Sequence, residues 1–282
     1  MLRIRTMHIE DIPFALRLSD QENWGMTQND LRRILRLNPR GSFLAYDGTR
    51  KLGLATTTSF GKKVAWIGNV IVEKRLRGKH IGHRLGEHAV TYLKKSKIQH
   101  VALYAYDQNV EFYENLGFVK DRQFLRMKRR ASEVRYSKYD FKCKLNFRRL
   151  LSVDRKAFGA DRSQLIRLLA SEENTWCLGI TRGLESAAYL IIKRFPNDSE
   201  FGPWVGIKTS KDELRSMLRA ALAKTGRNPI EASCLRNNSR ALDLLKSHGF
   251  RTVTEGYRMY YEERPHLGDD RAQYALGFLD KG

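Results

Sequence analysis

Acidic residues, cysteines and long apolar runs are all scarce in this sequence of 282 residues. Only 31 Asp and Glu oppose 52 Lys and Arg, which gives a formal net charge of +21 and an attraction for anions, acidic proteins or nucleic acid. Because Cys143, Cys177 and Cys234 are odd in number and widely spaced, we expect no disulfide framework, no metal cluster and a reducing, cytoplasmic location. No run approaches the ~18 apolar residues of a membrane span, and the first residues lack a signal-peptide pattern.

Signatures of nucleotide-binding loops and of nucleic-acid modules are missing as well. The sequence has no GxxxxGK[ST] loop, no GxGxxG fingerprint and no RNA-recognition motif. Lys120–Arg149 is rich in Lys and Arg, with interleaved aromatic residues. We interpret it as a strand, a linker and a second strand. A solvated surface explains its composition better than an RNA contact, so nucleic acid is a partner that the sequence permits but does not favour.

The most informative stretch is a strand, a basic glycine-containing loop and a helix in succession. Val70–Val72 end an apolar run typical of a buried strand, and apolar residues recur at helical spacing from Ile81 to Leu93. The first N–H groups of a helix have no partners within it, and the helix dipole favours an anion there. The loop therefore resembles a cradle for a pyrophosphate. The alternative is an ordinary connection with solvated basic residues.

The segment RGKHIGHRL, which begins at Arg77, resembles the acyl-coenzyme A loop of the GNAT superfamily of N-acetyltransferases, usually written [QR]xxGx[GA]. Arg77 matches the first position and Gly82 the last, but His80 occupies the place of the middle glycine. If that place requires a positive φ, a histidine costs ~1 kcal/mol there. The resemblance extends from about Asn23 to Phe118 and is closest at WGMTQNDLRRIL, LGLATTT, AWIGNVIV and FYENLGF.

The order of the expected elements agrees with the α/β (α+β) fold of that family. In the first part of the chain we expect strands at 42–46, 52–59 and 64–72, a helix after the loop, a strand at 101–106, a short helix at 110–116 and a strand at 124–128. This order predicts a GNAT domain over residues 1–132, with a mixed, mostly antiparallel central sheet flanked by helices.

Residues 133–282 resemble a second, degenerate GNAT-like domain, because the same order of elements recurs. Its expected elements are a helix at 161–169, strands at 175–181, 186–193 and 202–207, a helix at 211–224, a strand at 230–234 and a short helix from 238. The copies differ where the cradle would lie, because Ile207 is followed by KTSKDE. Asp212 and Glu213 suit a helix N-terminus but would repel a pyrophosphate. We therefore expect only the first domain to bind the acyl donor.

The resemblance implies that acetyl-coenzyme A is the acyl donor, with no metal. The residues it assigns to donor binding are Val70, Ile71, Val72, Arg77, Gly78, Lys79, His80, Ile81, Gly82, His83 and Asn109. The backbone of Val70–Val72 would pair with the pantetheine arm if the strands diverge there. Asn109 lies close to Tyr106, which occupies the place of an asparagine frequent in the superfamily.

Tyr113 lies four residues before Gly117, where the family often places the tyrosine that protonates the departing sulfur. We predict that Tyr113 is the general acid, and a ring that only packs against the donor is the alternative. The matching place in the second copy is Leu245, which cannot donate a proton.

For the acceptor pocket we propose Trp24 and Trp66, with a core position as the alternative for Trp66. No general base is evident; Glu73 is a candidate by proximity alone. The sequence thus predicts an N-acetyltransferase that acts by direct attack on the thioester. The acceptor is a primary amine of a small molecule, an amino acid or a protein, and the oligomeric state is open. The alternative is a non-catalytic protein on the same scaffold, which senses coenzyme A or associates with nucleic acid.

Overall fold

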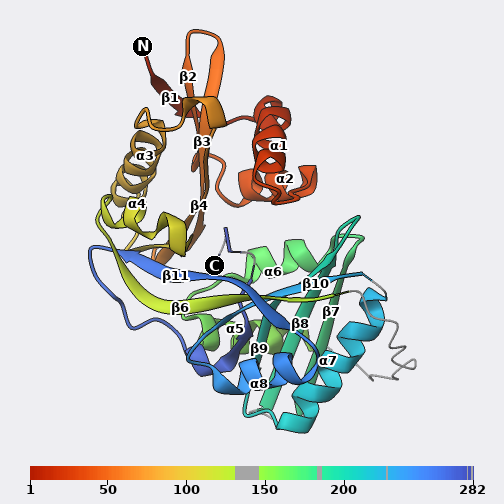
Figure 1. Cartoon of the computed structure of the whole chain (residues 1–282). Helices are drawn as coiled ribbons and strands as arrows, with labels where there is room; N and C mark the ends of the chain where they lie inside the picture. The colour runs from red at the N-terminus through yellow and green to blue at the C-terminus, as the bar shows by residue number, and fades with distance from the viewer. Residues whose placement is uncertain (131–145, 183–185, 227, 278, 281) are drawn as a thin grey trace. The chain divides into compact units, whose positions relative to one another are not determined.

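The computed structural model describes residues 1–130, 146–182, 186–226, 228–277, 279–280 and 282. The chain divides into two units (Figure 1). Unit 1 contains Met1–Asp121, Arg258–Pro265 and Leu279–Gly282, and unit 2 contains Arg122–Tyr257 and His266–Phe278. The predicted domain boundary, between 132 and 133, lies outside the described residues. The return of two late segments to unit 1 was not foreseen from the sequence.

Unit 1 is a mixed sheet with helices on both faces. Its elements are β1 (Arg3–Thr6), α1 (Ile12–Gln21), α2 (Gln28–Leu37), β2 (Ser42–Asp47), β3 (Arg50–Phe60), β4 (Val64–Val72), α3 (Ile81–Lys95), β5 (His100–Tyr106), α4 (Val110–Glu114), the start of β6 (Phe118–Arg129) and the end of β11 (Arg251–Tyr261). The strand order is β1-β2-β3-β4-β5-β11-β6. Strands β1 to β4 pair antiparallel, whereas β4 and β5 pair parallel. The predicted fold class is confirmed.

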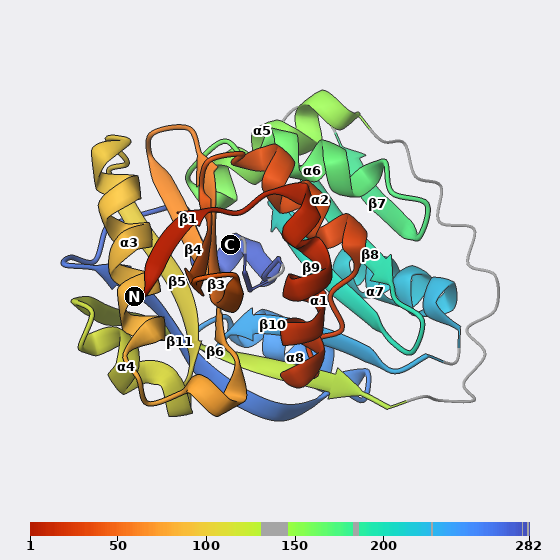
Figure 2. The same cartoon turned by 90° about the horizontal axis from the view of Figure 1, so that it is seen from above.

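The two helical layers of unit 1 lie on opposite faces of its sheet. Helices α1 and α2 cover one face and α3 covers the other (Figure 2). The α1–α2 layer buries a cluster that includes Leu18, Ile34 and Ile71. Thr27 begins α2 as expected, because its hydroxyl accepts the N–H of Asp30 and the Asp30 carboxylate accepts the N–H of Thr27. Ile71 therefore anchors β4 in the core, next to the stretch that carries the candidate site.

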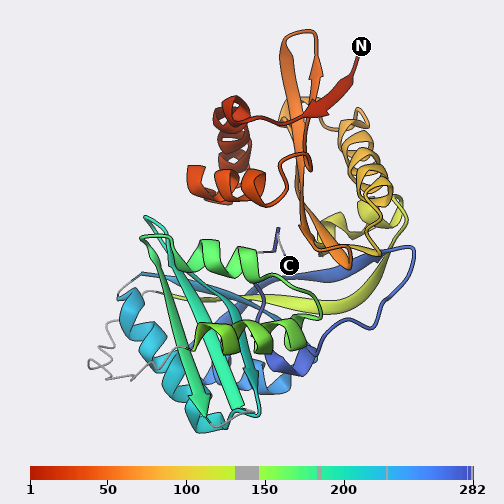
Figure 3. The ribbon, with the colours of Figure 1, turned by 180° about the vertical axis from the view of Figure 1, so that it is seen from behind.

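Unit 2 repeats this plan with its own elements. They are α5 (Phe147–Phe158), α6 (Ser163–Ala170), β7 (Thr175–Arg182), β8 (Ser186–Arg194), β9 (Ser199–Ile207), α7 (Lys211–Thr225), β10 (Ile230–Leu235), α8 (Ser239–Ser247) and β12 (Gln273–Ala275), with the rest of β6 and β11. The strand order is β11-β6-β10-β9-β8-β7, and β12 pairs with β9. Helices α5 and α6 cover one face of the sheet and α7 and α8 the other (Figure 3).

Helix α5 corrects the sequence analysis, which placed a strand up to Arg149. Asn146 caps the start of the helix instead, because its side chain accepts the N–H of Arg149. Leu150, Val153 and Ala157 then recur at helical spacing and are buried. The rest of the strand predicted before α5 falls in 131–145, outside the described residues.

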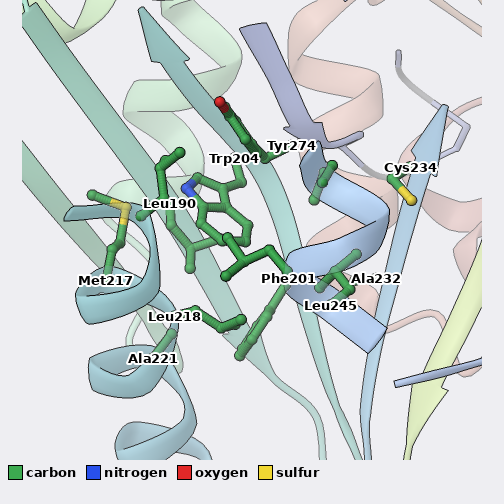
Figure 4. Close-up of a cluster of buried hydrophobic side chains, with 14 of the residues drawn as sticks. Leu190, Phe201, Trp204, Met217, Leu218, Ala221, Ala232, Cys234, Leu245 and Tyr274 are labelled. Carbon is green, nitrogen blue, oxygen red and sulfur yellow. The ribbon is translucent and has the colours of Figure 1, made fainter. Parts of the chain in front are cut away.

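The core of unit 2 lies between α7, α8 and the sheet (Figure 4). Phe201 and Trp204 of β9, Met217 and Leu218 of α7 and Leu245 of α8 are all fully buried in it. Because the side chains here are densely packed, the removal of even one methyl group should lower the stability of the protein. No helix in the described part of the chain is long and apolar enough to cross a membrane.

Candidate functional site

The site begins where β4 and β5 separate. The two strands pair in parallel at three positions, Val64 with His100, Ala65 with Val101 and Trp66 with Ala102. Strand β4 then continues to Val72, while β5 leads into Asn109 and α4. Val70, Ile71 and Val72 line a pocket that opens beyond the last paired position. The two strands therefore diverge after Trp66, which is the condition that the sequence analysis set for a free edge of β4.

A β-bulge lies at the inner end of this wall. Leu54 of β3 pairs with Ile71, but Thr56 pairs with Gly68, so β4 uses one residue more than β3 over this interval. Asn69 accommodates the extra residue with a left-handed φ of 51°. Its buried side chain donates to Thr56 Oγ1 at 2.9 Å, and Thr56 Oγ1 donates to the Gly68 carbonyl at 3.1 Å. Bulges redirect a strand locally, and this one sets the direction of Val70.

The predicted pyrophosphate loop leads directly into α3. Gly78 has a φ of 76°, and His80, the residue before the helix, has a φ of 56°. His80 therefore occupies the left-handed position whose cost the sequence analysis considered. Among the described residues, no side chain caps α3. The N–H groups of its first turn are therefore available to an anion. A methyl group at Gly82 would lie 3.5 Å from Phe112, which is an ordinary contact.

Arg77 is held across the pocket by two groups. Its Nε donates to the Val72 carbonyl at 3.4 Å, and its guanidinium forms an ion pair with Glu22. Both partners line the same pocket. This arrangement fixes a planar, always charged donor next to the open end of α3.

The far side of the pocket is formed by the α4 segment. Tyr113 lies with its ring 4.9 Å from that of Phe112 and 6.0 Å from that of Phe118, both edge to face. Burial raises the pKa of the Tyr113 phenol well above its usual value. The phenol therefore stays protonated at neutral pH and is able to donate a proton or a hydrogen bond.

One pocket of about 600 Å³ brings most of the predicted site residues together. Those that line it are Trp24, Val70, Ile71, Val72, Arg77, Gly78, His80, Ile81, Gly82, His83, Asn109 and Tyr113. Lys79 belongs to the loop but is exposed and does not line the pocket. The lining also includes Glu22, Leu76, Phe112 and Asn115, which the sequence analysis did not propose. Phe112 and Asn115 belong to FYENLGF, so their place in the pocket could have been predicted from that motif. No sequence pattern pointed to Glu22.

Two predicted residues lie elsewhere in unit 1. Trp66 is 1% exposed, and its ring packs 5.9 Å from Tyr104 and 6.5 Å from Tyr260. Trp66 is therefore a core residue, whose large apolar indole is buried against other aromatic rings. Glu73 is not among the pocket residues. It forms ion pairs with Arg50 at 3.1 Å and Arg17 at 3.6 Å.

Around one pocket the structure thus brings together the end of β4, the start of α3 and the phenol of Tyr113. The sequence matches the acetyltransferase (GNAT) family over residues 5–118 and an acetyltransferase (GNAT) domain over residues 150–275. The chain therefore belongs to the GNAT acetyltransferase family and carries two such domains in tandem.

The chain is similar to several known proteins at low identity. The uncharacterized N-acetyltransferase YitH of Bacillus subtilis is 22% identical over 265 residues, which cover 92% of this chain and 91% of that protein. A putative acetyltransferase of Pyrococcus horikoshii has the same fold with a TM-score of 0.81 at 20% identity, covering 100% and 96% of the two chains. A tandem GNAT protein from the clavulanic acid biosynthesis pathway has a TM-score of 0.63 at 12% identity, covering 94% and 99%.

Proposed function

We propose that this chain is an N-acetyltransferase that transfers the acetyl group of acetyl-coenzyme A to a primary amine by direct attack on the thioester. One observation carries the proposal. One pocket in unit 1 is lined by Val70–Val72 of β4, the N-terminus of α3 and the phenol of Tyr113. Each of these three parts suits a different section of an acyl-coenzyme A.

The donor fits these residues section by section. The N–H groups at the start of α3, with Arg77, suit a pyrophosphate, because they combine unpaired donors with positive charge. The edge of Val70–Val72 suits the amide groups of a pantetheine arm, which can pair with a strand as a neighbouring strand would. Tyr113, which lines the same pocket, suits the role of proton donor to the sulfur.

In the reaction the thioester supplies an activated acyl carbon. A new N–C bond forms at that carbon, the C–S bond breaks, and the amine nitrogen loses a proton. Tyr113 holds the proton that the departing sulfur needs, and its raised pKa keeps that proton in place until the sulfur becomes basic. An N–H group at the bulge before Val70 is suited to stabilise the negative charge that develops on the carbonyl oxygen.

Isothermal titration with acetyl-coenzyme A, followed by a thiol-release assay with amines, tests the proposal. We expect saturable binding of one donor per chain and thiol release that depends on an amine. The assay should include polyamines, amino acids and basic peptides. An absence of binding at millimolar donor would refute the proposal. Donor binding without thiol release from any amine would instead identify a non-catalytic coenzyme A sensor.

A further inference from the structure

Glu22 is an acidic side chain in a pocket that suits a diphosphate. It lines the pocket together with Arg77, Gly78 and His80, and among the described residues that line this pocket it is the only Asp or Glu. A carboxylate at this place repels the phosphates that Arg77 and the start of α3 would attract. The pocket therefore contains one group whose charge opposes the proposed donor, and its presence there calls for an explanation.

The carboxylate of Glu22 meets the guanidinium of Arg77. The two form an ion pair through Arg77 Nη2, while Arg77 Nε donates to the Val72 carbonyl at 3.4 Å. A guanidinium binds carboxylates and phosphates with the same planar set of N–H donors. Glu22 thus occupies N–H groups of Arg77 that a phosphate would use, and the two anions compete for one cation.

The ion pair between Glu22 and Arg77 is of a kind that exchanges easily. The Arg77 side chain is 47% exposed, and ion pairs so open to water contribute little to stability. A diphosphate carries more negative charge than one carboxylate and can also meet the N–H groups at the start of α3. A donor bound there would displace Glu22, and the carboxylate would return once the phosphates leave.

The backbone around Glu22 is anchored independently of its side chain. The N–H groups of Glu22 and Trp24 both donate to the Ser19 carbonyl at 3.1 Å, and the N–H of Met26 donates to the Ser19 hydroxyl at 3.3 Å. Ser19 itself is fully buried. A rotation of the Glu22 side chain is therefore enough to release Arg77, and the chain between α1 and α2 does not have to move.

A second carboxylate, at the end of β4, forms similar ion pairs away from the pocket. Glu73 pairs with Arg50 of β3 at 3.1 Å and with Arg17 of α1 at 3.6 Å. Neither Glu73 nor these two partners line the pocket. Its carboxylate joins β3 and α1 to the end of β4, so Glu73 offers a matched control for the role of Glu22.

We propose that Glu22 is the exchange partner of the donor at Arg77: the diphosphate of acetyl-coenzyme A displaces the carboxylate, and the carboxylate returns as coenzyme A leaves. Glu22 thereby limits the affinity for donor and product and speeds product release, a step that often limits turnover in enzymes. This inference rests on the proposed function. It makes Glu22 a positioning residue, which acts through Arg77 and not on the reacting atoms.

The test measures the binding of coenzyme A to the full chain by calorimetry and its dissociation rate by stopped-flow displacement. Glu22→Gln keeps the length of the side chain and removes its charge. We expect this variant to bind coenzyme A about tenfold more tightly, mainly through slower dissociation, and to bind inorganic pyrophosphate more tightly as well. Glu73→Gln makes the same change of charge outside the pocket and should leave both affinities unchanged. Melting curves check that both variants are folded.

The Arg77→Gln background shows whether Glu22 acts through Arg77. Without the guanidinium the carboxylate has no cation to occupy, so Glu22→Gln should change the affinity for coenzyme A much less than in the wild type. A gain of equal size in both backgrounds would mean that Glu22 only repels the phosphates, which overturns the exchange. Weaker binding of coenzyme A by Glu22→Gln alone also overturns it, because the ion pair would then hold Arg77 in place for the donor.

The outcomes separate this inference from the proposed function. A wild-type chain that binds neither acetyl-coenzyme A nor coenzyme A contradicts the proposed function, and the exchange with it. If the wild type binds both, and Glu22→Gln binds coenzyme A with the same affinity and the same dissociation rate, the proposed function stands and only the exchange is wrong.

Discussion

The helix that follows β4 in unit 1 and the helix that follows β9 in unit 2 begin in opposite ways. Helix α3 starts after His80 in a left-handed conformation, with no side-chain cap from the described residues. Helix α7 starts after Ser210, which accepts the N–H of Glu213 at 3.2 Å, while the Glu213 carboxylate accepts the N–H of Ser210 at 2.8 Å. The first turn of α7 therefore satisfies part of its own donors and carries acidic charge.

The same contrast holds at the short helix after the next strand. Tyr113 of α4 lines the pocket of unit 1, whereas Leu245 of α8 is 0% exposed in the core of unit 2. In unit 1 these two places border a pocket, whereas in unit 2 they serve capping and packing. If the proposed function is correct, a few side chains at corresponding positions separate a donor-binding GNAT domain from one that does not bind the donor.

The largest expected effect tests the packing role in unit 2. Leu245→Ala should lower the free energy of unfolding by about 2–5 kcal/mol, because it leaves a cavity in a fully buried cluster. Chemical denaturation measures this loss, and calorimetry below the transition should show unchanged affinity for acetyl-coenzyme A. A loss of donor affinity in the folded variant would show that unit 2 takes part in donor binding.

A charge reversal in the loop of unit 1 should abolish most donor binding. Arg77→Glu removes a donor from the pocket and places a carboxylate beside Glu22 and the phosphates, so affinity for acetyl-coenzyme A should fall about a hundredfold. The matched control is Lys211→Glu, which makes the same reversal at the start of α7 and should have no effect. Equal affinities of Arg77→Glu and wild type would remove the loop from the proposal.

Transfer of the α7 cap to α3 tests the comparison most directly. The double variant His80→Ser and His83→Glu gives the start of α3 the residue types found at Ser210 and Glu213. It should weaken the binding of acetyl-coenzyme A about tenfold, because it adds an acid to the first turn of the helix. Titration calorimetry measures this effect. Unchanged donor affinity would mean that the first turn of α3 does not contact the phosphates.

Loss of the phenol should act on turnover and not on binding. Tyr113→Phe should lower kcat by about a hundredfold, as the loss of a general acid implies, with an unchanged Kd for acetyl-coenzyme A. Because burial raises the pKa of Tyr113, the wild-type phenol should stay protonated, and its ionisation should cause no fall in kcat below pH ~10. Tyr46→Phe, on β2 outside the pocket, is the control. Full turnover by Tyr113→Phe would leave the residue a packing role.

The smallest effect concerns the backbone of the cradle. His80→Gly should stabilise the protein by at most ~1 kcal/mol, because glycine tolerates a φ of 56° without strain but gains entropy in the unfolded chain. Lys97→Gly, at a φ of 57° after α3, should give a similar gain and serves as the control. If His80→Gly also weakens donor binding, the imidazole contacts the donor.

Much of the fold could be predicted from local patterns, and the exceptions are instructive. The strand, loop and helix around Arg77 lie at the residues that the apolar spacing and the glycines predicted. Helix α5 was missed because Arg148 and Arg149 were assigned to the end of a basic strand, although Leu150 and Val153 keep helical spacing. The sequence alone could not distinguish a core position from a pocket position for Trp66, because aromatic side chains occur in both.

The sequence by itself determined how the two copies differ in the loop and the helix cap that follow the central strand, since loop chemistry and helix capping depend on neighbours a few residues apart. Only the tertiary structure decided how β4 opens, which of the predicted residues face one pocket and which late segments complete unit 1. The contact of Asp280 with Asn69 joins positions 211 residues apart. No local rule encodes such a contact, because it depends on how the whole chain returns to the bulge.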